Sequence, residues 1–256
     1  MTKPQQADFG LSQLLEFTQD ELAKYRLIAG HMPFGIHEKL GIMMQYFGFL
    51  RDPIERSISD YYFVKTEPPS HYLYHQARTL SIEKYLAYRA SISRDNVQTR
   101  LVSGLWDTVP FEPVNAGMLD LAKQNLQSHF ILVGLAEKFD ESLLVLQRIL
   151  ALPNVYYMRR NVTAARPRYE ELSERDQNSL QYYNQLDLAL YEHAQKLFAQ
   201  QRANYGLSLD EDVRVLRRRN RLLGGPMHQY WRIRGFIRKT IENRRYAQGH
   251  LYHDAA

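Results

Sequence analysis

The chain has 256 residues, and 45% of them are apolar, which is enough to bury the core of one globular domain. It contains no cysteine, so disulfides, thiolate metal sites and cysteine nucleophiles are excluded. The formal net charge is +5, and the excess of basic residues lies near the C-terminus.

Membrane insertion and secretion are not indicated by the residue pattern. No stretch approaches the roughly 20 consecutive apolar residues that a membrane-spanning helix needs. The first ten residues are polar and lack the apolar centre of a signal peptide. The sequence therefore predicts a soluble, cytoplasmic protein.

The N-terminal part of the chain predicts a helix, a short strand and a turn. Residues 9–25 have an approximate apolar helical face, which the polar run 18–21 interrupts. Residues 26–29 predict a strand that ends at a turn rich in glycine and proline, residues 30–35. This turn carries His31, whose imidazole titrates near neutrality and is suited to act as a general base. A lone histidine at a strand end also fits a structural role.

The run from Tyr46 to Phe63 predicts a strand, a tight turn and a helix. Residues 46–50 are apolar and rich in aromatic side chains, as expected for a buried strand. Asp52 is suited to cap a helix, and Pro53 fits its first position, where no backbone donor is needed. Apolar residues then recur at helical spacing.

This geometry predicts an anion-binding site. A helix start presents free backbone N–H groups and the positive end of the helix dipole. Arg51 leaves the strand beside it, with a guanidinium suited to a phosphate. Ser59 lies about two helical turns further on, facing the side on which the helix begins. The alternative is that Arg51 pairs with Glu55 and Ser59 is only a helix residue.

The segment of residues 51–63 resembles the 3′-phosphate-binding segment of the carbohydrate sulfotransferases, the group that includes heparan sulfate 2-O-sulfotransferase. The resemblance implies that Arg51 and Ser59 bind the 3′-phosphate of 3′-phosphoadenosine 5′-phosphosulfate (PAPS). It implies that His31, in a Gly-His pair upstream, is the catalytic base. Animal members are anchored in the Golgi membrane, so the unanchored pattern here is more similar to a bacterial member.

The middle of the chain carries two further candidate sites. His71 and His75 are four residues apart, as in some zinc sites, but no third ligand is evident and no metal is predicted. Residues 95–104 resemble an Asn-x-Gln-Thr-Arg segment of the same family, in which Arg100 would contact an acidic sugar. The alternative is that Arg100 is a structural or surface residue.

Three more segments belong to the expected core and one to the nucleotide site. Residues 116–127 predict a helix, residues 130–135 a buried strand and residues 137–150 a helix. Residues 161–167 form a polar segment, and the resemblance implies that such a loop folds over the nucleotide. The candidate contacts in this loop and directly before it are Arg160, Thr163 and Arg166, and the alternative is a solvated connector.

The C-terminal part is helical and basic. Residues 184–202 predict an amphipathic helix in which Asp187 and Tyr191 are expected to pack. Residues 214–245 hold eleven lysines and arginines against one acidic residue, Glu242. Either they form basic helices packed on the domain, or they bind an anionic polymer or membrane surface.

The resemblance implies an α/β, P-loop-kinase-like fold over residues 1–205, with a small parallel sheet flanked by helices, and a basic helical extension over residues 206–256. The implied function is sulfuryl transfer from PAPS to a hydroxyl of a saccharide or polysaccharide. The family's Pro-Lys-Thr loop, which binds the 5′-phosphosulfate, has no counterpart in this sequence. The alternatives are therefore an inactive nucleotide-binding relative, or a basic module that binds an anionic polymer.

Overall fold

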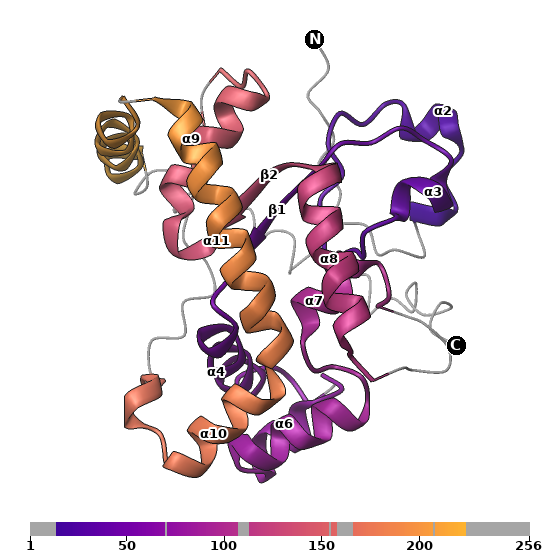
Figure 1. The fold of residues 1–256 in the computed structure, drawn as a ribbon, viewed down its shortest axis with the longest axis vertical. Coiled ribbons are helices and arrows are strands. Elements are labelled where there is room, and N and C mark those ends of the chain that lie inside the picture. The colour runs from indigo at the N-terminus through magenta and orange to yellow at the C-terminus, as the bar shows by residue number, and fades with distance from the viewer. Residues whose placement is uncertain are drawn as a thin grey trace, which may run out of the picture.

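The computed structural model describes residues 14–69, 71–106, 113–153, 155–157, 166–206 and 208–223. Helices surround a small parallel sheet of two strands, β1 (Tyr46–Leu50) and β2 (Phe130–Leu135) (Figure 1). The helices are, in chain order, α2 (Gln19–Leu22), α3 (Ile36–Leu40), α4 (Pro53–Val64), α5 (Tyr74–Thr79), α6 (Ile82–Ser91), α7 (Val97–Ser103), α8 (Ala116–His129), α9 (Phe139–Ile149), α10 (Glu174–Tyr183) and α11 (Gln185–Tyr205). Short 3₁₀ turns, η1 (Ala136–Lys138) and η2 (Tyr169–Glu171), precede α9 and α10.

The two strands pair in parallel, as their apolar character predicted. Phe47 lies opposite Leu132 and Leu50 opposite Leu135, with a register shift between Tyr46 and Phe47. Since both strands end at the same edge, the turns that follow β1 and β2 are neighbours. The α/β prediction is therefore confirmed, although the fold is mostly helical.

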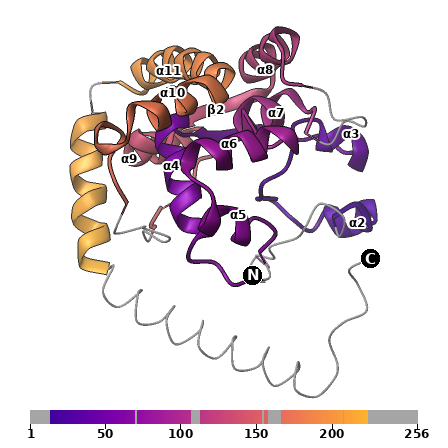
Figure 2. The same ribbon diagram turned by 90° about the horizontal axis from the view of Figure 1, so that it is seen from below.

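Two apolar clusters hold the elements together. In the first, α8, α9 and α11 cover the sheet through buried residues such as Leu132, Val133, Leu190 and Phe198. In the second, α4, α5, α6 and α10 meet around Ile58, Tyr85 and Leu180. Figure 2 shows α4 and α5 projecting below the layer that contains α10 and α11. The turn after β1 lies between these clusters.

The expected strand at residues 26–29 is wrong, because these residues are irregular in the structure. A strand is stable only when a neighbour supplies partners for its backbone groups, and no neighbouring strand is described beside this segment. The predicted break in the first helix is confirmed: Thr18 caps α2 in a capping box with Glu21.

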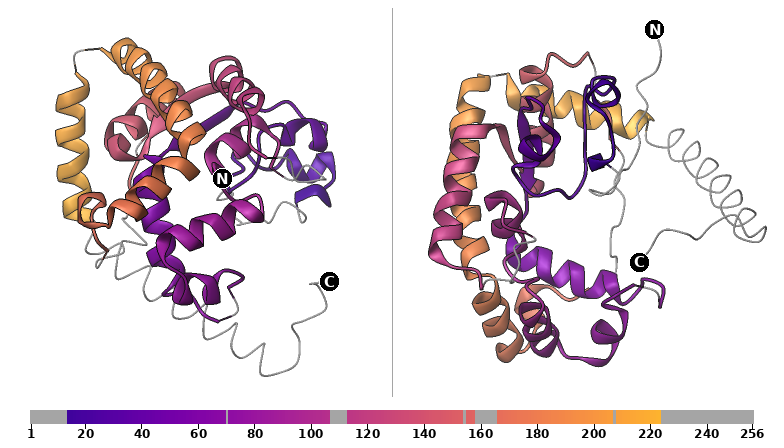
Figure 3. Two further views of the ribbon diagram at one scale, coloured as in Figure 1. Left: turned by 60° about the horizontal axis from the view of Figure 1, so that its bottom comes forward. Right: turned by 90° about the vertical axis from the view of Figure 1, so that its right-hand side faces the viewer.

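The basic extension begins as a helix over residues 209–223, which stands at one side of the domain (Figures 2 and 3). Leu209, Val213 and Leu216 pack on Leu144 of α9. Arg217 pairs with Asp140 at 2.6 Å, whereas Arg218, Arg219 and Arg221 are exposed. The remaining basic residues of the predicted patch, up to residue 245, lie outside the described residues. None of the described helices has the length and apolar character to span a bilayer.

Candidate functional site

The turn between β1 and α4 lies at the carboxyl edge of the sheet. Asp52 is the N-cap of α4, and its Oδ1 accepts hydrogen bonds from the backbone N–H groups of Ile54 and Glu55, both at 2.9 Å. The Arg56 N–H donates to the Asp52 carbonyl. The prediction that this helix start offers free N–H groups to an anion is therefore wrong, because the Asp52 carboxylate occupies them.

Arg51 is held in place by side chains from distant parts of the chain. Gln98 accepts a hydrogen bond from the Arg51 N–H at 2.8 Å and donates one to the Arg51 carbonyl at 2.9 Å. The Glu137 carboxylate accepts from the Asp52 N–H at 3.0 Å. The main chain at Arg51 and Asp52 is thus fixed from α7 and from the end of β2.

The Arg51 guanidinium has no hydrogen bond or ion pair with any described residue, and the side chain is half-buried. Its positive charge contributes to lowering the pKa of Arg56, although burial of Arg56 is the larger cause. Glu55 pairs with Arg166, so the alternative in which Arg51 pairs with Glu55 is wrong. Arg51 is therefore available to a ligand as far as the described residues extend.

Ser59 and Arg166 belong to the same side of α4. Arg166 donates to the Glu55 carboxylate at 2.6 Å and to its carbonyl at 3.3 Å. Ser59 follows Glu55 by one helical turn, which places both on one face of the helix. The Ser59 hydroxyl is half-buried and has no hydrogen bond to a described residue. Arg160 and Thr163, the other predicted nucleotide contacts, lie outside the described residues.

His31 is exposed in the loop between α2 and α3. Three residues later, the Phe34 N–H donates to the Leu101 carbonyl at 2.8 Å. The centre of the Phe34 ring lies 4.9 Å from the centre of the Tyr46 ring and 6.1 Å from that of Phe130. Tyr46 and Phe130 begin the two strands, so this loop is anchored at the amino end of the sheet. Arg51 lies at the other end, and Figure 1 shows α3 and α4 on opposite sides of the strands.

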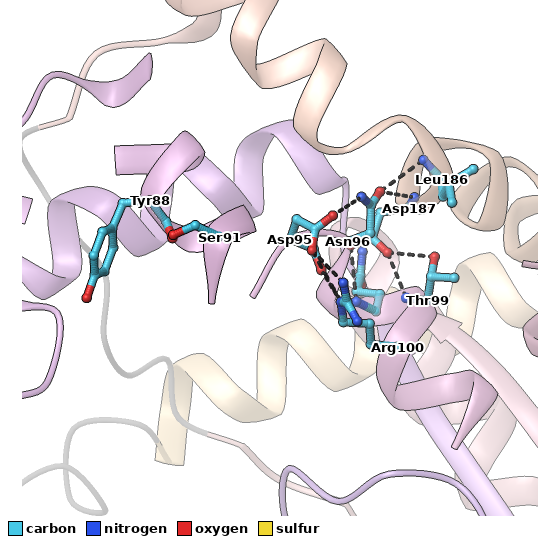
Figure 4. Close-up of polar contacts among 9 residues, drawn as sticks. Tyr88, Ser91, Asp95, Asn96, Thr99, Arg100, Leu186 and Asp187 are labelled. Carbon is cyan, nitrogen blue, oxygen red and sulfur yellow. Dashed lines mark hydrogen bonds and ion pairs between the residues drawn. The ribbon is translucent and has the colours of Figure 1, made fainter. Parts of the chain in front are cut away.

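The segment around Arg100 has a structural function in the fold (Figure 4). Arg100 is 1% exposed and pairs with Asp95 at 2.8 Å. This placement matches the structural alternative and does not support contact with a sugar. His71 and His75 share no helix, because α5 begins at Tyr74, and the His71 Nδ1 accepts a hydrogen bond from the Leu73 N–H.

Two helices cap each other through Asn96 and Asp187 (Figure 4). The side-chain Oδ1 of Asn96 accepts from the N–H groups of Leu186 and Asp187, at the start of α11. The Asp187 carboxylate accepts from the N–H groups of Gln98 and Thr99, at the start of α7, and from the Thr99 hydroxyl. This reciprocal pair fixes α7, and with it Gln98, against α11.

Burial and charge act in opposite directions at Asp187. The side chain is completely buried, and burial raises the pKa of its carboxyl group, while the Arg56 charge and the bonds from Thr99 lower it. Burial also lowers the pKa of Arg56, whereas the negative charge of Asp187 raises it. The two groups therefore stabilise each other's charged form inside the domain.

Three residues that support the turn were not identified from the sequence as such: Gln98, Glu137 and Tyr191. The Tyr191 hydroxyl donates to Glu137 at 2.6 Å, and burial, followed by this bond, raises the pKa of Tyr191. Asp187 and Tyr191 are buried, as expected for packing residues, and both also form hydrogen bonds. The sequence signal that could have identified these three residues was that each one places a polar group within a mostly apolar segment.

Comparison with known proteins gives one family. A family model described as galactose-3-O-sulfotransferase matches residues 8–227. Galactose-3-O-sulfotransferase 2 of Mus musculus is 28% identical over 78% of the chain and 52% of its own length. The Homo sapiens protein of that name is 29% identical over 82% of the chain and 56% of its length. Galactose-3-O-sulfotransferase 3 of Mus musculus is 36% identical over 39% of the chain and 24% of its length.

The chain spans about half the length of the first two relatives, which are both named galactose-3-O-sulfotransferase 2. No solved structure matches the chain.

Proposed function

We propose a function from one established fact: the chain belongs to the galactose-3-O-sulfotransferase family, whose model matches residues 8–227. The proposed reaction is transfer of a sulfuryl group from PAPS to a hydroxyl of a saccharide. The relatives named above are galactose-3-O-sulfotransferases, so the proposed acceptor carries galactose and reacts at its 3-hydroxyl. This replaces the closer likeness to heparan sulfate 2-O-sulfotransferase that the sequence suggested.

The observation that carries the proposal is the half-buried Arg51 guanidinium, which has no partner among the described residues and follows a parallel strand directly. Ligands of parallel α/β sheets bind beyond the carboxyl ends of the strands. A guanidinium there suits the two oxygens of a phosphate. Arg51 and Ser59 are the proposed ligands of the donor's 3′-phosphate.

Arg166 is the proposed third contact on this side. Its ion pair with Glu55 holds the guanidinium near the face that carries Ser59. Both side chains are partly exposed, so Arg166 can keep its ion pair with Glu55 and donate another N–H to an incoming phosphate. The Glu55 carboxylate then orients Arg166 rather than binding the nucleotide itself.

His31 is the proposed general base. It takes the proton of the acceptor hydroxyl as that oxygen bonds to sulfur, and the bond from sulfur to the 5′-phosphate oxygen breaks in line. The products are the sulfated saccharide and 3′-phosphoadenosine 5′-phosphate. The 3′-phosphate and the sulfuryl group are at different ends of the donor, which is consistent with the separation of Arg51 from the His31 loop.

Calorimetry with 3′-phosphoadenosine 5′-phosphate tests the nucleotide site. Hydrogen bonds to charged groups contribute about 1.5–3 kcal/mol, so Arg51→Ala should weaken binding about 10- to 150-fold. Ser59→Ala should weaken it by a smaller factor. His31→Ala should bind normally, as should the control Arg78→Ala, whose arginine is exposed on α5. Equal affinity of Arg51→Ala and the unmodified chain would reject the site.

A turnover assay separates the enzyme from an inactive relative. With PAPS and a galactose-terminated saccharide, the natural protein should form sulfated product, and His31→Ala should lose this activity while keeping nucleotide affinity. Nucleotide binding without any product would support the inactive relative instead.

A further inference from the structure

A small cavity lined by arginines lies beside α4, and Ser59 is not among the residues that line it. It is formed by α4, α6, the segment before α7 and the end of α10, and Arg56, Arg89, Arg94 and Tyr183 are among its lining residues. The cavity is small, with room for one particle about the size of a water molecule.

Two N–H groups of residues that line this cavity lack partners among the described residues. Arg89 is 6% exposed, and although its Nη1 pairs with Asp60 at 2.5 Å, its Nε is buried without a hydrogen bond. The Nη1 of Arg94 is also buried and unpaired, while the face of its guanidinium lies 4.3 Å from the Trp106 ring. Buried donors of this kind are costly when they bind nothing.

The charges around the cavity do not balance. Arg56, Arg89, Arg94 and Arg100 contribute four positive charges, whereas Asp60, Asp95 and Asp187 contribute three negative ones. Arg89 forms an ion pair with Asp60, and Arg100 forms one with Asp95. Asp187 lies near Arg56. Among the described residues, the charge of Arg94 has no counterpart. Both free N–H groups belong to charged guanidinium groups, and hydrogen bonds between charged partners are stronger than those to neutral ones, so an anion suits these donors better than a water molecule.

We propose that this cavity binds a monatomic anion of the halide type, with chloride as the physiological form. A chloride ion is only slightly larger than water, accepts hydrogen bonds from several donors, and supplies the missing negative charge. Phosphate and sulfate are too large for the space. The bound ion ties α4 to α6 and to the segment that leads into α7, the helix that carries Gln98. The site is independent of the proposed transferase activity.

Thermal unfolding of the full chain provides the first test, with sodium chloride compared against sodium gluconate at equal ionic strength. Chloride at about 100 times its dissociation constant should raise the unfolding temperature by about 5 °C or more, because it binds only the folded state. Gluconate is too large to enter and should have no such effect. Equal unfolding temperatures in the two salts would reject the site.

Arg94→Gln removes the uncompensated charge and is the decisive variant. Its unfolding temperature should no longer depend on chloride and, in gluconate, should equal or exceed that of the unmodified chain. The control is Arg78→Gln, because Arg78 also stacks on an aromatic ring, Tyr74, but does not line the cavity. The control should keep the full chloride response, and loss of that response in both variants would contradict the proposal.

A crystal soaked in bromide gives an answer even if Arg94→Gln fails to fold. The proposal predicts an anomalous peak within hydrogen-bond distance of the Arg89 Nε and the Arg94 Nη1. A carboxylate in that position, or no peak, would overturn it. A peak without any chloride effect on unfolding would mean an adventitious ion only, which also overturns it.

Discussion

At the scale of single residues, Arg51 depends on Gln98. Gln98 is 8% exposed and uses both ends of its amide on the Arg51 main chain, so it sets the direction in which the guanidinium leaves β1. Gln98 does not itself need to touch the nucleotide. Its effect on binding is one of positioning.

Replacing Gln98 by alanine should therefore weaken binding of 3′-phosphoadenosine 5′-phosphate about 10-fold and also lower stability by about 1–3 kcal/mol, because two backbone groups lose their partner. Gln201 is a matched control. It holds the β2 backbone in the same way, through the Val133 N–H and the Ile131 carbonyl, away from Arg51. Gln201→Ala should lose stability but keep nucleotide affinity. Calorimetry and urea unfolding of both variants check this.

Asp187 gives a prediction about pH. Burial raises the pKa of its carboxyl group above the unfolded value, so the folded state binds this proton more readily. Its contribution to stability is then complete below the unfolded pKa near 3.9 and is lost as pH rises through the folded pKa. Urea unfolding from pH 4 to pH 8 should show the stability of the unmodified chain, relative to Asp187→Asn, decreasing as pH rises. An increase with pH would contradict this.

At the scale of elements, the starts of α7 and α11 depend on each other. Asn96 has a positive φ of 41°, so its replacement combines the loss of a cap with backbone strain unless glycine is used. The cap serves α11 through two hydrogen bonds, and Asp187 returns two backbone bonds to α7.

Asn96→Gly should lower the free energy of unfolding by about 1–2 kcal/mol, because it removes the cap and keeps the backbone conformation accessible. Asn96→Ala should cost about 1–2 kcal/mol more, because alanine is strained at positive φ. Urea unfolding of the two variants separates these effects. Equal stability of both variants would show that the strain is absent.

At the scale of the whole molecule, the described part of the basic extension is attached to the domain by its apolar side. Leu216 is 4% exposed against α9, while its neighbour Val215 is 37% exposed. The exposed arginines of this helix face solvent, so packing on the domain and contact with an anionic partner are compatible.

Leu216→Ala should lower the free energy of unfolding by about 2–4 kcal/mol, because it removes buried methyl groups and leaves a cavity. Val215→Ala should change it by less than about 0.5 kcal/mol. The comparison uses urea unfolding of the full chain. If the two variants were equally stable, the helix would not be packed on α9 in solution.

The sequence by itself determined the strand, turn and helix of residues 46–63, the second strand, the break in the first helix at residues 18–21 and the cap at Asp52, because these follow from local patterns of apolar, capping and proline residues. Only the tertiary structure decided the rest of the site. The Asp52 carboxylate accepts from the backbone N–H groups that were expected to bind an anion, and Gln98 and Glu137 hold the turn. Arg100 is buried against Asp95, and Arg166 pairs with Glu55. Most of these bonds join residues far apart in the chain, where local propensity carries no information, and the choice between competing partners depends on packing.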